Sequence, residues 1–318
     1  MLRVKNLKKY FEVDKGFFSK EKNYIKAVDD ISFNINKGET LALVGESGCG
    51  KSTTGKTILR LHEKTDGNVI FNGVNIHEIS KEELRKLRPK MQMIFQDPFS
   101  SLNPKMNVEK LISESLFEHK LYPQNEIKDR VLEVINNCGL SSYHLQKKPH
   151  EFSGGQRQRI GIARALALKP ELIICDEPVS ALDVSIQSQI INLLMESQAK
   201  YNLSYLFISH DLSVVKHIAN RVGVMYLGSL IEIADKNELY SNPVHPYTKA
   251  LLSSIPIPDP SIKRERINLK GDIPSPLNPP SGCKFHTRCP YCMSVCKEVK
   301  PKLKYINDSS HLVACHLN

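Results

Sequence analysis

A glycine-rich loop near residue 50 carries the side chains best suited to chemistry in this chain. Residues 45–53 match the phosphate-cradling pattern G-x-x-x-x-G-K-[ST] and are Gly45, Glu46, Ser47, Gly48, Cys49, Gly50, Lys51, Ser52 and Thr53. The apolar run 40–44 predicts a buried strand before the loop, and residues 53–61 predict a helix after it. Backbone N–H groups and the helix dipole favour a polyanion at such a junction. We expect Lys51 to reach the β- and γ-phosphates of a nucleoside triphosphate and the Ser52 hydroxyl to ligate Mg²⁺.

Polar side chains follow three further apolar runs. Asp176 and Glu177 come after a predicted strand at 172–175. Asp176 is placed to hold Mg²⁺, and Glu177 to polarise a water for in-line attack on the γ-phosphate. Taken alone, an Asp-Glu pair after a strand is equally typical of a helix start. Gln96 and His210 are either sensors of Mg²⁺ or γ-phosphate or ordinary polar residues at strand ends.

A second anion-binding candidate precedes a helix that is predicted to end near Leu168. The stretch consists of Ser153, Gly154, Gly155 and Gln156. Ser153 can cap the helix, and the glycines leave its N-terminus open to an anion. The alternative interpretation is a plain capping turn.

The remaining pattern predicts an α/β protein. We expect a strand at 27–33, a hairpin at 68–73 with Asn72-Gly73 as the turn, and a mainly helical section at 108–138. Strands at 172–175 and 204–208 with a helix at 185–201 form a β-α-β unit. Closely spaced prolines from residue 255 onward place a domain boundary near residue 253.

Composition limits the classes of protein that remain. The 318 residues allow one large α/β domain and a smaller appendage, and 41% hydrophobic with 25% charged residues is ordinary for a globular protein. No apolar run approaches the roughly 18 residues of a membrane span, and the N-terminus lacks a signal-peptide core, so we expect a cytosolic protein. The net charge of +10 is spread along the chain, which favours solvated surface over a nucleic-acid groove.

In chain order these motifs resemble the full motif series of the ATP-binding-cassette (ABC) ATPases. The series is the phosphate loop, Gln96, the stretch 153–156, Asp176-Glu177, the stretch 180–183 and His210. Over residues 1–252 the resemblance implies a P-loop NTPase with a RecA-like core, an N-terminal β-subdomain and a helical subdomain at about 97–165. It also implies that two such domains pack head to tail. Each ATP then lies between one subunit's phosphate loop and the other subunit's residues 153–156.

The resemblance assigns two more contacts. Phe11 is implied to stack on adenine, with Tyr10 as the runner-up, and Asp183 to contact the partner subunit. The signature begins with Phe152 where leucine is usual, a departure that removes no group that touches phosphate.

The spacing of the motifs and the C-terminal region narrow the kind of cassette. Only 56 residues separate Gln96 from Ser153, which leaves no room for the long coiled coil of DNA-repair cassettes. Residues 245–252 and the following proline-rich segment resemble the ATPases of oligopeptide and dipeptide importers, and the stretches 48–50 and 88–92 favour their F-type subunit. This resemblance implies an ATPase at the cytoplasmic face of the membrane that powers peptide import. Its implied partners are a D-type ATPase subunit, two membrane permease subunits and an extracytoplasmic peptide-binding protein.

Two alternatives to peptide import stay open from the sequence. One is an importer subunit for nickel or glutathione, and the other is a nucleic-acid-linked ABC ATPase.

Five of the eight cysteines lie between residues 283 and 315, and the others are Cys49, Cys138 and Cys175. Cys138 and Cys175 are expected to be small buried residues. Because a cytosolic chain seldom holds structural disulfides, the cluster indicates metal or redox chemistry. The family resemblance implies a [4Fe–4S] site, with Zn²⁺ or unligated thiols as alternatives. Its four implied ligands are Cys283, Cys289, Cys296 and Cys315, while Cys292 is a competing ligand or a spare thiol.

Overall fold

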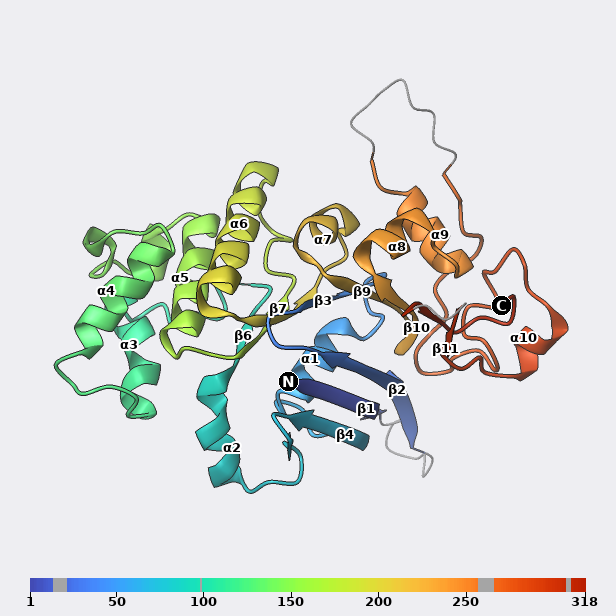
Figure 1. Ribbon diagram of the computed structural model, residues 1–318, viewed down its shortest axis with the longest axis horizontal. Helices are drawn as coiled ribbons and strands as arrows, with labels where there is room; N and C mark the ends of the chain where they lie inside the picture. The colour runs from blue at the N-terminus through green and yellow to red at the C-terminus, as the bar shows by residue number, and fades with distance from the viewer. Residues whose placement is uncertain (14–21, 98, 257–265, 307–309) are drawn as a thin grey trace. The chain divides into compact units, whose positions relative to one another are not determined.

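The computed structural model describes residues 1–13, 22–97, 99–256, 266–306 and 310–318 (Figure 1). The chain forms two compact units. Residues 1–35, 41–77 and 209–318 make up the first, which we call the phosphate-loop unit. Residues 36–40 and 78–208 make up the second, which we call the helical unit.

An antiparallel sheet of four strands forms one layer of the phosphate-loop unit. Its strands lie in the order β2-β1-β4-β5 and are β1 (Leu2–Val13), β2 (Asn23–Ile35), β4 (Asp66–Phe71) and β5 (Val74–Asn75). Strands β4 and β5 are joined by Asn72 and Gly73, both with positive φ (47° and 86°), as a two-residue hairpin turn requires. The predicted hairpin and the predicted strand at 27–33 are therefore confirmed.

A second group of strands carries the phosphate loop. Strand β3 (Thr40–Val44) is buried along its whole length and pairs in parallel with β9 (Arg221–Tyr226), which pairs antiparallel with β10 (Ser229–Asp235). Two short strands near the C-terminus, β11 (Lys304–Tyr305) and β12 (Leu312–Val313), extend this group beyond β10. The helices of the unit are α1 (Lys51–Ile58), α7 (Leu212–Ile218), α8 (Lys236–Ser241), α9 (Pro246–Ser253) and α10 (Ser294–Glu298). Strands near the C-terminus thus share a sheet with β10, β9 and β3.

A buried carboxylate links strand β10 to residues nearer the C-terminus. Glu232 of β10 is fully buried and accepts hydrogen bonds from the backbone N–H groups of Val244 (2.8 Å) and His245 (3.1 Å). The Nε2 atom of His311 lies 2.8 Å from the same carboxylate, and this hydrogen bond raises the pKa of His311. His245 is also buried, and burial lowers its pKa to about 4. The surroundings therefore favour the charged form of His311 and the neutral form of His245.

The helical unit contains a parallel β-α-β arrangement and several packed helices. Strands β6 (Met91–Ile94), β7 (Leu172–Asp176) and β8 (Ser204–Ile208) run in parallel, and α6 (Val184–Tyr201) connects β7 to β8. The other α-helices are α2 (Lys81–Leu87), α3 (Val108–Glu118), α4 (Ile127–Asn137) and α5 (Gly154–Ala167), and the short 3₁₀ helices are Arg88–Lys90, Ser142–His144 and Pro149–Glu151. Helices α3, α4 and α5 pack against one another. The predicted helical section at 108–138 and the predicted β-α-β unit are confirmed.

Helix α1 differs from its predicted bounds. It begins at Lys51, two residues early, because the left-handed backbone of Gly50 (φ 103°) turns the loop directly into the helix. It ends at Ile58, and Arg60 is itself left-handed (φ 51°). Lys51 and Ser52 therefore stand in the first helical turn. The predicted domain boundary near residue 253 stays a prediction.

In the part of the chain that the structure describes, no helix has both the length and the apolar character needed to cross a bilayer.

Candidate active site

The phosphate loop is shaped by two glycines for which no other residue fits. Gly45 has φ 149° and Gly50 has φ 103°. A Cβ atom at Gly45 would lie 2.3 Å from the carbonyl oxygen of Met225, and one at Gly50 would lie 2.0 Å from that of Ala27. Backbone from β9 and β2 thus presses against the loop on both sides. This close approach lets the loop fold tightly enough for its N–H groups to converge on an anion.

Lys51 directs its ammonium group into the loop. Its side chain is 4% exposed, and Nζ donates hydrogen bonds to the carbonyl oxygens of Gly45 (2.8 Å) and Glu46 (3.1 Å). Helix α1 has no side-chain N-cap and no acidic residue in its first turn. The positive end of the helix and the Lys51 charge therefore act together, which suits a polyphosphate.

The other loop residues divide into exposed and buried positions. Ser47 and Gly48 are exposed, whereas Ser52 and Thr53 are partly buried at the start of α1. Cys49 is 4% exposed, and its burial raises the pKa of the thiol although the nearby Lys51 ammonium opposes this effect. Cys49 is therefore a buried structural thiol in the loop.

Glu46 is held by residues far along the chain. Its backbone N–H donates to the hydroxyl oxygen of the buried Tyr247 (2.9 Å). Its carboxylate accepts two hydrogen bonds from the guanidinium of Arg288, Nη1 to Oε2 at 2.8 Å and Nη2 to Oε1 at 3.3 Å. The sequence interpretation missed both partners. The available signal was the acidic residue itself, because a carboxylate in a loop that binds a polyanion needs a positive neighbour.

A second carboxylate, Asp29 of β2, is held from the same C-terminal region. Its carboxylate forms an ion pair with Lys284 (2.8 Å). It also accepts hydrogen bonds from the Lys300 ammonium (3.1 Å) and the Tyr10 hydroxyl (2.6 Å). Burial raises the Asp29 pKa, but the hydrogen bonds from Lys284 and Tyr10 outweigh it and hold the pKa well below its usual range. Asp29 is therefore a fixed negative charge.

The two aromatic candidates for adenine stacking differ in surroundings. The Tyr10 hydroxyl is bound to Asp29, as described above. The Phe11 ring meets the His62 ring edge-on at 5.5 Å between centroids, and the Lys9 ammonium lies 4.7 Å from the Phe11 centroid. The stacking of Phe11 on adenine, with Tyr10 as the runner-up, stays a prediction.

His210 lies in the phosphate-loop unit at the end of the loop that follows β8. The preceding residue, Ser209, donates its backbone N–H to the carbonyl oxygen of Leu43 in β3 (3.2 Å). Strand β3 leads directly into the phosphate loop. This hydrogen bond therefore places the exposed His210 beside the strand that precedes the phosphate loop. Its role as a γ-phosphate sensor stays a prediction.

The helical unit brings together two of the predicted catalytic residues. Strands β6 and β7 are parallel neighbours, with Ile94 opposite Cys175, so the residues after them emerge at the same edge. Asp176 is 3% exposed at the end of β7, and Glu177 follows it with φ 46°. The amide Nε2 of Gln96 donates to Oε2 of Glu177 at 2.9 Å. This hydrogen bond fixes the orientation of the Glu177 carboxylate.

The stretch 153–156 forms the predicted capped helix start. The Ser153 hydroxyl accepts from the backbone N–H of Gln156, and the Gln156 side chain returns the bond, which completes a capping box. Ser153 and Gly154 are exposed, as a surface that meets a partner requires. A Cβ atom at Gly155 would lie 2.5 Å from Cγ2 of Ile186, so only glycine allows this helix start to pack there.

Two other positions from the sequence analysis lie in the helical unit. Asp183 is exposed at the N-cap of α6, and its contact with a partner subunit stays a prediction. Phe152 is 4% exposed, so it fills the apolar position that leucine usually occupies.

The cysteines show a mixed outcome. Cys138 and Cys175 are fully buried, as predicted, and burial raises the pKa of Cys138 to about 12. Among the described residues, no group of three or more His, Cys, Asp or Glu side chains is arranged to hold a metal ion. The predicted metal cluster is therefore not confirmed.

The C-terminal cysteines are nevertheless neighbours. The backbone N–H of Cys283 donates to the carbonyl oxygen of Cys296 (2.8 Å). Burial, together with the nearby thiols of Cys296, Cys315 and Cys289, raises the pKa of Cys283 to about 11.

Together, the P-loop between a parallel strand and a helix, the carboxylates at the end of β7 and the capped glycine helix start define an ATPase of the ATP-binding-cassette class. The model of the ABC transporter family matches residues 28–180. The model of the oligopeptide/dipeptide transporter C-terminal region matches residues 231–296.

Relatives and solved structures agree with these matches. The oligopeptide transport ATP-binding protein AppF of Bacillus subtilis is 56% identical over 100% of this chain and 97% of its own length. OppF of Salmonella typhimurium is 49% identical over 99% of this chain and 95% of its own length. A dimeric post-hydrolysis structure of the ATP-binding cassette MJ0796 with ADP and phosphate covers 74% of this chain and 99% of its own, at 28% identity and a TM-score of 0.65. The chain belongs to the ATP-binding subunits of oligopeptide and dipeptide ABC transporters.

Proposed function

We propose that this chain hydrolyses ATP to power peptide import through membrane permeases encoded elsewhere. One observation carries the proposal: the chain matches oligopeptide transport ATP-binding proteins along its whole length, at 56% identity for AppF. The match at residues 231–296 to the C-terminal region of oligopeptide/dipeptide transporters supports it further. Nickel or glutathione remains an alternative cargo, since the permeases and the binding protein select what is transported. A nucleic-acid-linked ATPase is disfavoured by the same whole-length match.

The proposed catalytic cycle gives each predicted site residue one role. The phosphate loop binds the triphosphate through its backbone N–H groups, and Lys51 contacts the β- and γ-phosphates. Glu177 orients the attacking water and accepts its proton, with Gln96 holding the Glu177 carboxylate in place. His210 donates a hydrogen bond to the γ-phosphate. Most of the rate enhancement then comes from positioning and charge stabilisation.

Hydroxyl, carboxylate and amide oxygens are the donors that Mg²⁺ prefers, and the chain provides one of each in Ser52, Asp176 and Gln96. The hydrogen bond from Gln96 Nε2 to Glu177 leaves the Gln96 amide oxygen to act as a ligand. When bound, Mg²⁺ neutralises charge on the β- and γ-phosphates.

We also propose that the active form is a head-to-tail pair of ATPase subunits. The exposed Ser153 and Gly154 support this, because an anion-binding helix start on the surface can complete a partner's site. The structure that resembles this chain at a TM-score of 0.65 is likewise dimeric and holds ADP and phosphate. The proposed partner is a D-type ATPase subunit, with this chain as the F-type subunit. The pair binds two permeases at the cytoplasmic face of the membrane, and an extracytoplasmic protein delivers the peptide.

For the C-terminal thiols we propose a [4Fe–4S] cluster on Cys283, Cys289, Cys296 and Cys315, with Zn²⁺ as the alternative metal. Four thiolates are a soft donor set that suits either metal. The thiols lie near one another, since those of Cys296, Cys315 and Cys289 act on the pKa of Cys283 and that of Cys292 acts on the pKa of Cys289; the choice of four among the five follows the family resemblance. The described residues do not present a formed metal site, so the proposal requires the thiols to move together on metal binding.

Substitution of Glu177 tests the proposed function. In the complex assembled with permeases and partner ATPase, Glu177→Gln keeps ATP binding but slows turnover by about 10²–10⁴-fold, because the water loses its base. Lys51→Ala weakens ATP binding itself. Peptide-loaded binding protein should stimulate wild-type turnover. Near-normal turnover of Glu177→Gln would remove Glu177 from its role, and stimulation by DNA instead of peptide would favour the nucleic-acid-linked alternative.

A further inference from the structure

A short segment between two cysteines is fixed into the phosphate-loop unit by a buried aromatic ring. Phe285 lies between Cys283 and Cys289 and is 1% exposed. Its ring packs at 5.3 Å from that of Tyr226, 5.4 Å from Tyr247 and 5.5 Å from His245. Tyr247 is the residue whose hydroxyl accepts the Glu46 N–H. The segment is therefore rigidly attached to side chains that already contact the phosphate loop.

Two buried cations extend from this segment to two carboxylates of the nucleotide-binding region. Lys284 pairs with Asp29, and Arg288 pairs with Glu46 through its two terminal guanidinium nitrogens, Nη1 and Nη2. The side chains of Lys284 and Arg288 are both 8% exposed. A parallel pair of N–H···O bonds fixes the carboxylate in direction as well as position.

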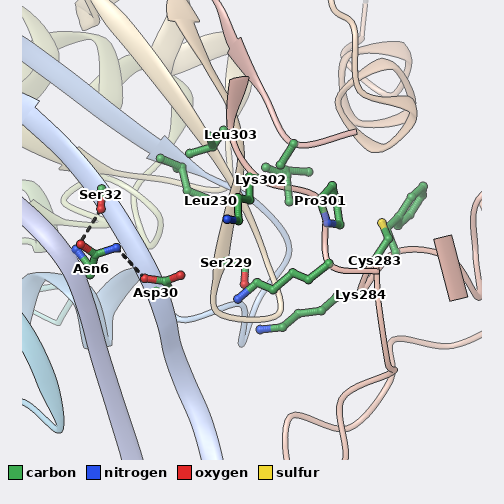
Figure 2. A pocket seen from close by; sticks show the side chains of 14 residues that line it. Asn6, Asp30, Ser32, Ser229, Leu230, Cys283, Lys284, Pro301, Lys302 and Leu303 are labelled. Atoms are coloured by element: carbon green, nitrogen blue, oxygen red, sulfur yellow. Dashed lines mark hydrogen bonds between the residues drawn. The ribbon is translucent and has the colours of Figure 1, made fainter. Parts of the chain in front are cut away.

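A cavity of about 500 Å³ borders the Lys284 end of the segment (Figure 2). Asn6, Asp30 and Ser32 line it from β1 and β2, and Cys283, Lys284 and Lys300 line it from the C-terminal region. Lys284 is anchored beside this space, since its Nζ donates to the carbonyl oxygen of Leu227 at 2.6 Å. Beside this cavity, Lys284 thus attaches the segment through specific polar contacts with Leu227 and Asp29.

Glu46 has all its polar groups engaged, and this determines the loop geometry. Its N–H is bound to Tyr247, its carboxylate to Arg288, and its carbonyl oxygen accepts from Lys51 Nζ. The residue that directs Lys51 is thus oriented by the C-terminal region. The Glu46 carboxylate also lies in a loop built for a polyanion, where an uncompensated negative charge would repel the ligand.

We propose that Arg288 is a positioning residue for ATP: it neutralises Glu46 and holds the phosphate loop in its binding conformation. The C-terminal region is then part of the nucleotide site within one subunit. This proposal rests on the proposed ATP-binding role of the loop. It assigns Arg288 no contact with the nucleotide, because both terminal nitrogens of its guanidinium bind Glu46.

Charge-changing variants of the full-length chain test the proposal through the Kd for a fluorescent ATP analogue. Arg288→Met should raise the Kd about tenfold or more, because Glu46 becomes an unpaired negative charge in the loop. Arg288→Lys, which keeps the positive charge but not the pair of hydrogen bonds to Glu46, should recover part of the affinity. In the Glu46→Gln background the effect of Arg288→Met should fall to a few-fold, since the charge to be neutralised is gone. Exposed Lys302→Met, in the same C-terminal region, is the matched control and should bind like wild type.

The outcomes separate this inference from the proposed function. If Lys51→Ala abolishes binding while folded Arg288→Met binds like wild type, the nucleotide site stands and the role of Arg288 is overturned. An equal loss in the wild-type and Glu46→Gln backgrounds would also overturn it, because the effect would not pass through Glu46. Turnover in the assembled complex provides a second readout. Arg288→Met should raise the KM for ATP while kcat at saturation stays within about threefold, and a fall in kcat with unchanged KM would contradict the proposal.

Discussion

Removal of the Phe285 ring tests whether the C-terminal region is an integral part of the phosphate-loop unit. Phe285 is 1% exposed and contacts three aromatic rings at centroid distances of 5.3 to 5.5 Å. Phe285→Ala removes this ring and leaves a cavity among Tyr226, Tyr247 and His245. The same change weakens the support of Tyr247, which accepts a hydrogen bond from the phosphate loop.

The expected loss follows from burial and packing. Truncation of a buried phenylalanine to alanine costs about 3–5 kcal/mol. The upper part of that range is expected here, because edge-to-face aromatic pairs contribute about 0.5–1.5 kcal/mol beyond burial. We therefore expect the free energy of unfolding to fall by about 4 kcal/mol. Affinity for ATP should fall as well, since Tyr247 and Arg288 both lose their anchor.

Urea unfolding followed by circular dichroism measures the loss, with Leu317→Ala as the control. Leu317 is 46% exposed in the same C-terminal region, so its truncation should cost less than about 0.5 kcal/mol. A loss below about 1 kcal/mol for Phe285→Ala would refute the reasoning. The C-terminal region would then be loosely attached, and its contacts with the loop would have little influence on stability.

Three further predictions concern the pair Glu232–His311, the helix start at Gly155 and the thiols. Because Glu232 raises the His311 pKa, the pair stabilises the fold below about pH 6.5 and this stabilisation is lost as pH rises through the raised value. The difference in unfolding free energy between wild type and His311→Asn should therefore shrink as the pH rises above about 6.5, and comparing the two proteins cancels the opposite contribution of His245. Gly155→Ala, whose Cβ would meet Ile186, should leave ATP binding intact but slow turnover of the assembled complex about tenfold or more, and unchanged turnover would contradict the shared site. In anaerobically purified protein, serine at any one of the four proposed ligand cysteines should abolish bound iron while Cys292→Ser keeps it; zinc without iron would replace the cluster.

Local features of the fold and site were predictable from sequence because they depend on neighbouring residues. The Asn72-Gly73 turn needs two residues with positive φ, and asparagine followed by glycine provides them. Strand β7 and the capped start of α5 likewise follow from a continuous apolar run and from a serine placed three residues before a glutamine. The phosphate loop was predictable for the same reason, since its glycines and Lys51 lie in one short stretch of sequence.

The contacts made by the C-terminal region could not be predicted in this way. Arg288 and Glu46 are separated by 242 residues, and no local pattern specifies their pairing. The prolines from residue 255 onward likewise gave no sign that strands β11 and β12 continue a sheet of the phosphate-loop unit. The start of α1 was missed by two residues, because the left-handed backbone of Gly50 is set by the close approach of Ala27.

The most direct test of the central claim is ATP-dependent peptide uptake by a reconstituted transporter. Proteoliposomes would contain this chain, its proposed partner ATPase and the two permeases, with a labelled oligopeptide and its binding protein supplied on the extracytoplasmic side. The account predicts uptake that requires ATP on the opposite side and that is lost with Glu177→Gln in this chain. Uptake that continues unchanged with Glu177→Gln, or ATP hydrolysis by the complete complex with no peptide uptake, would contradict it.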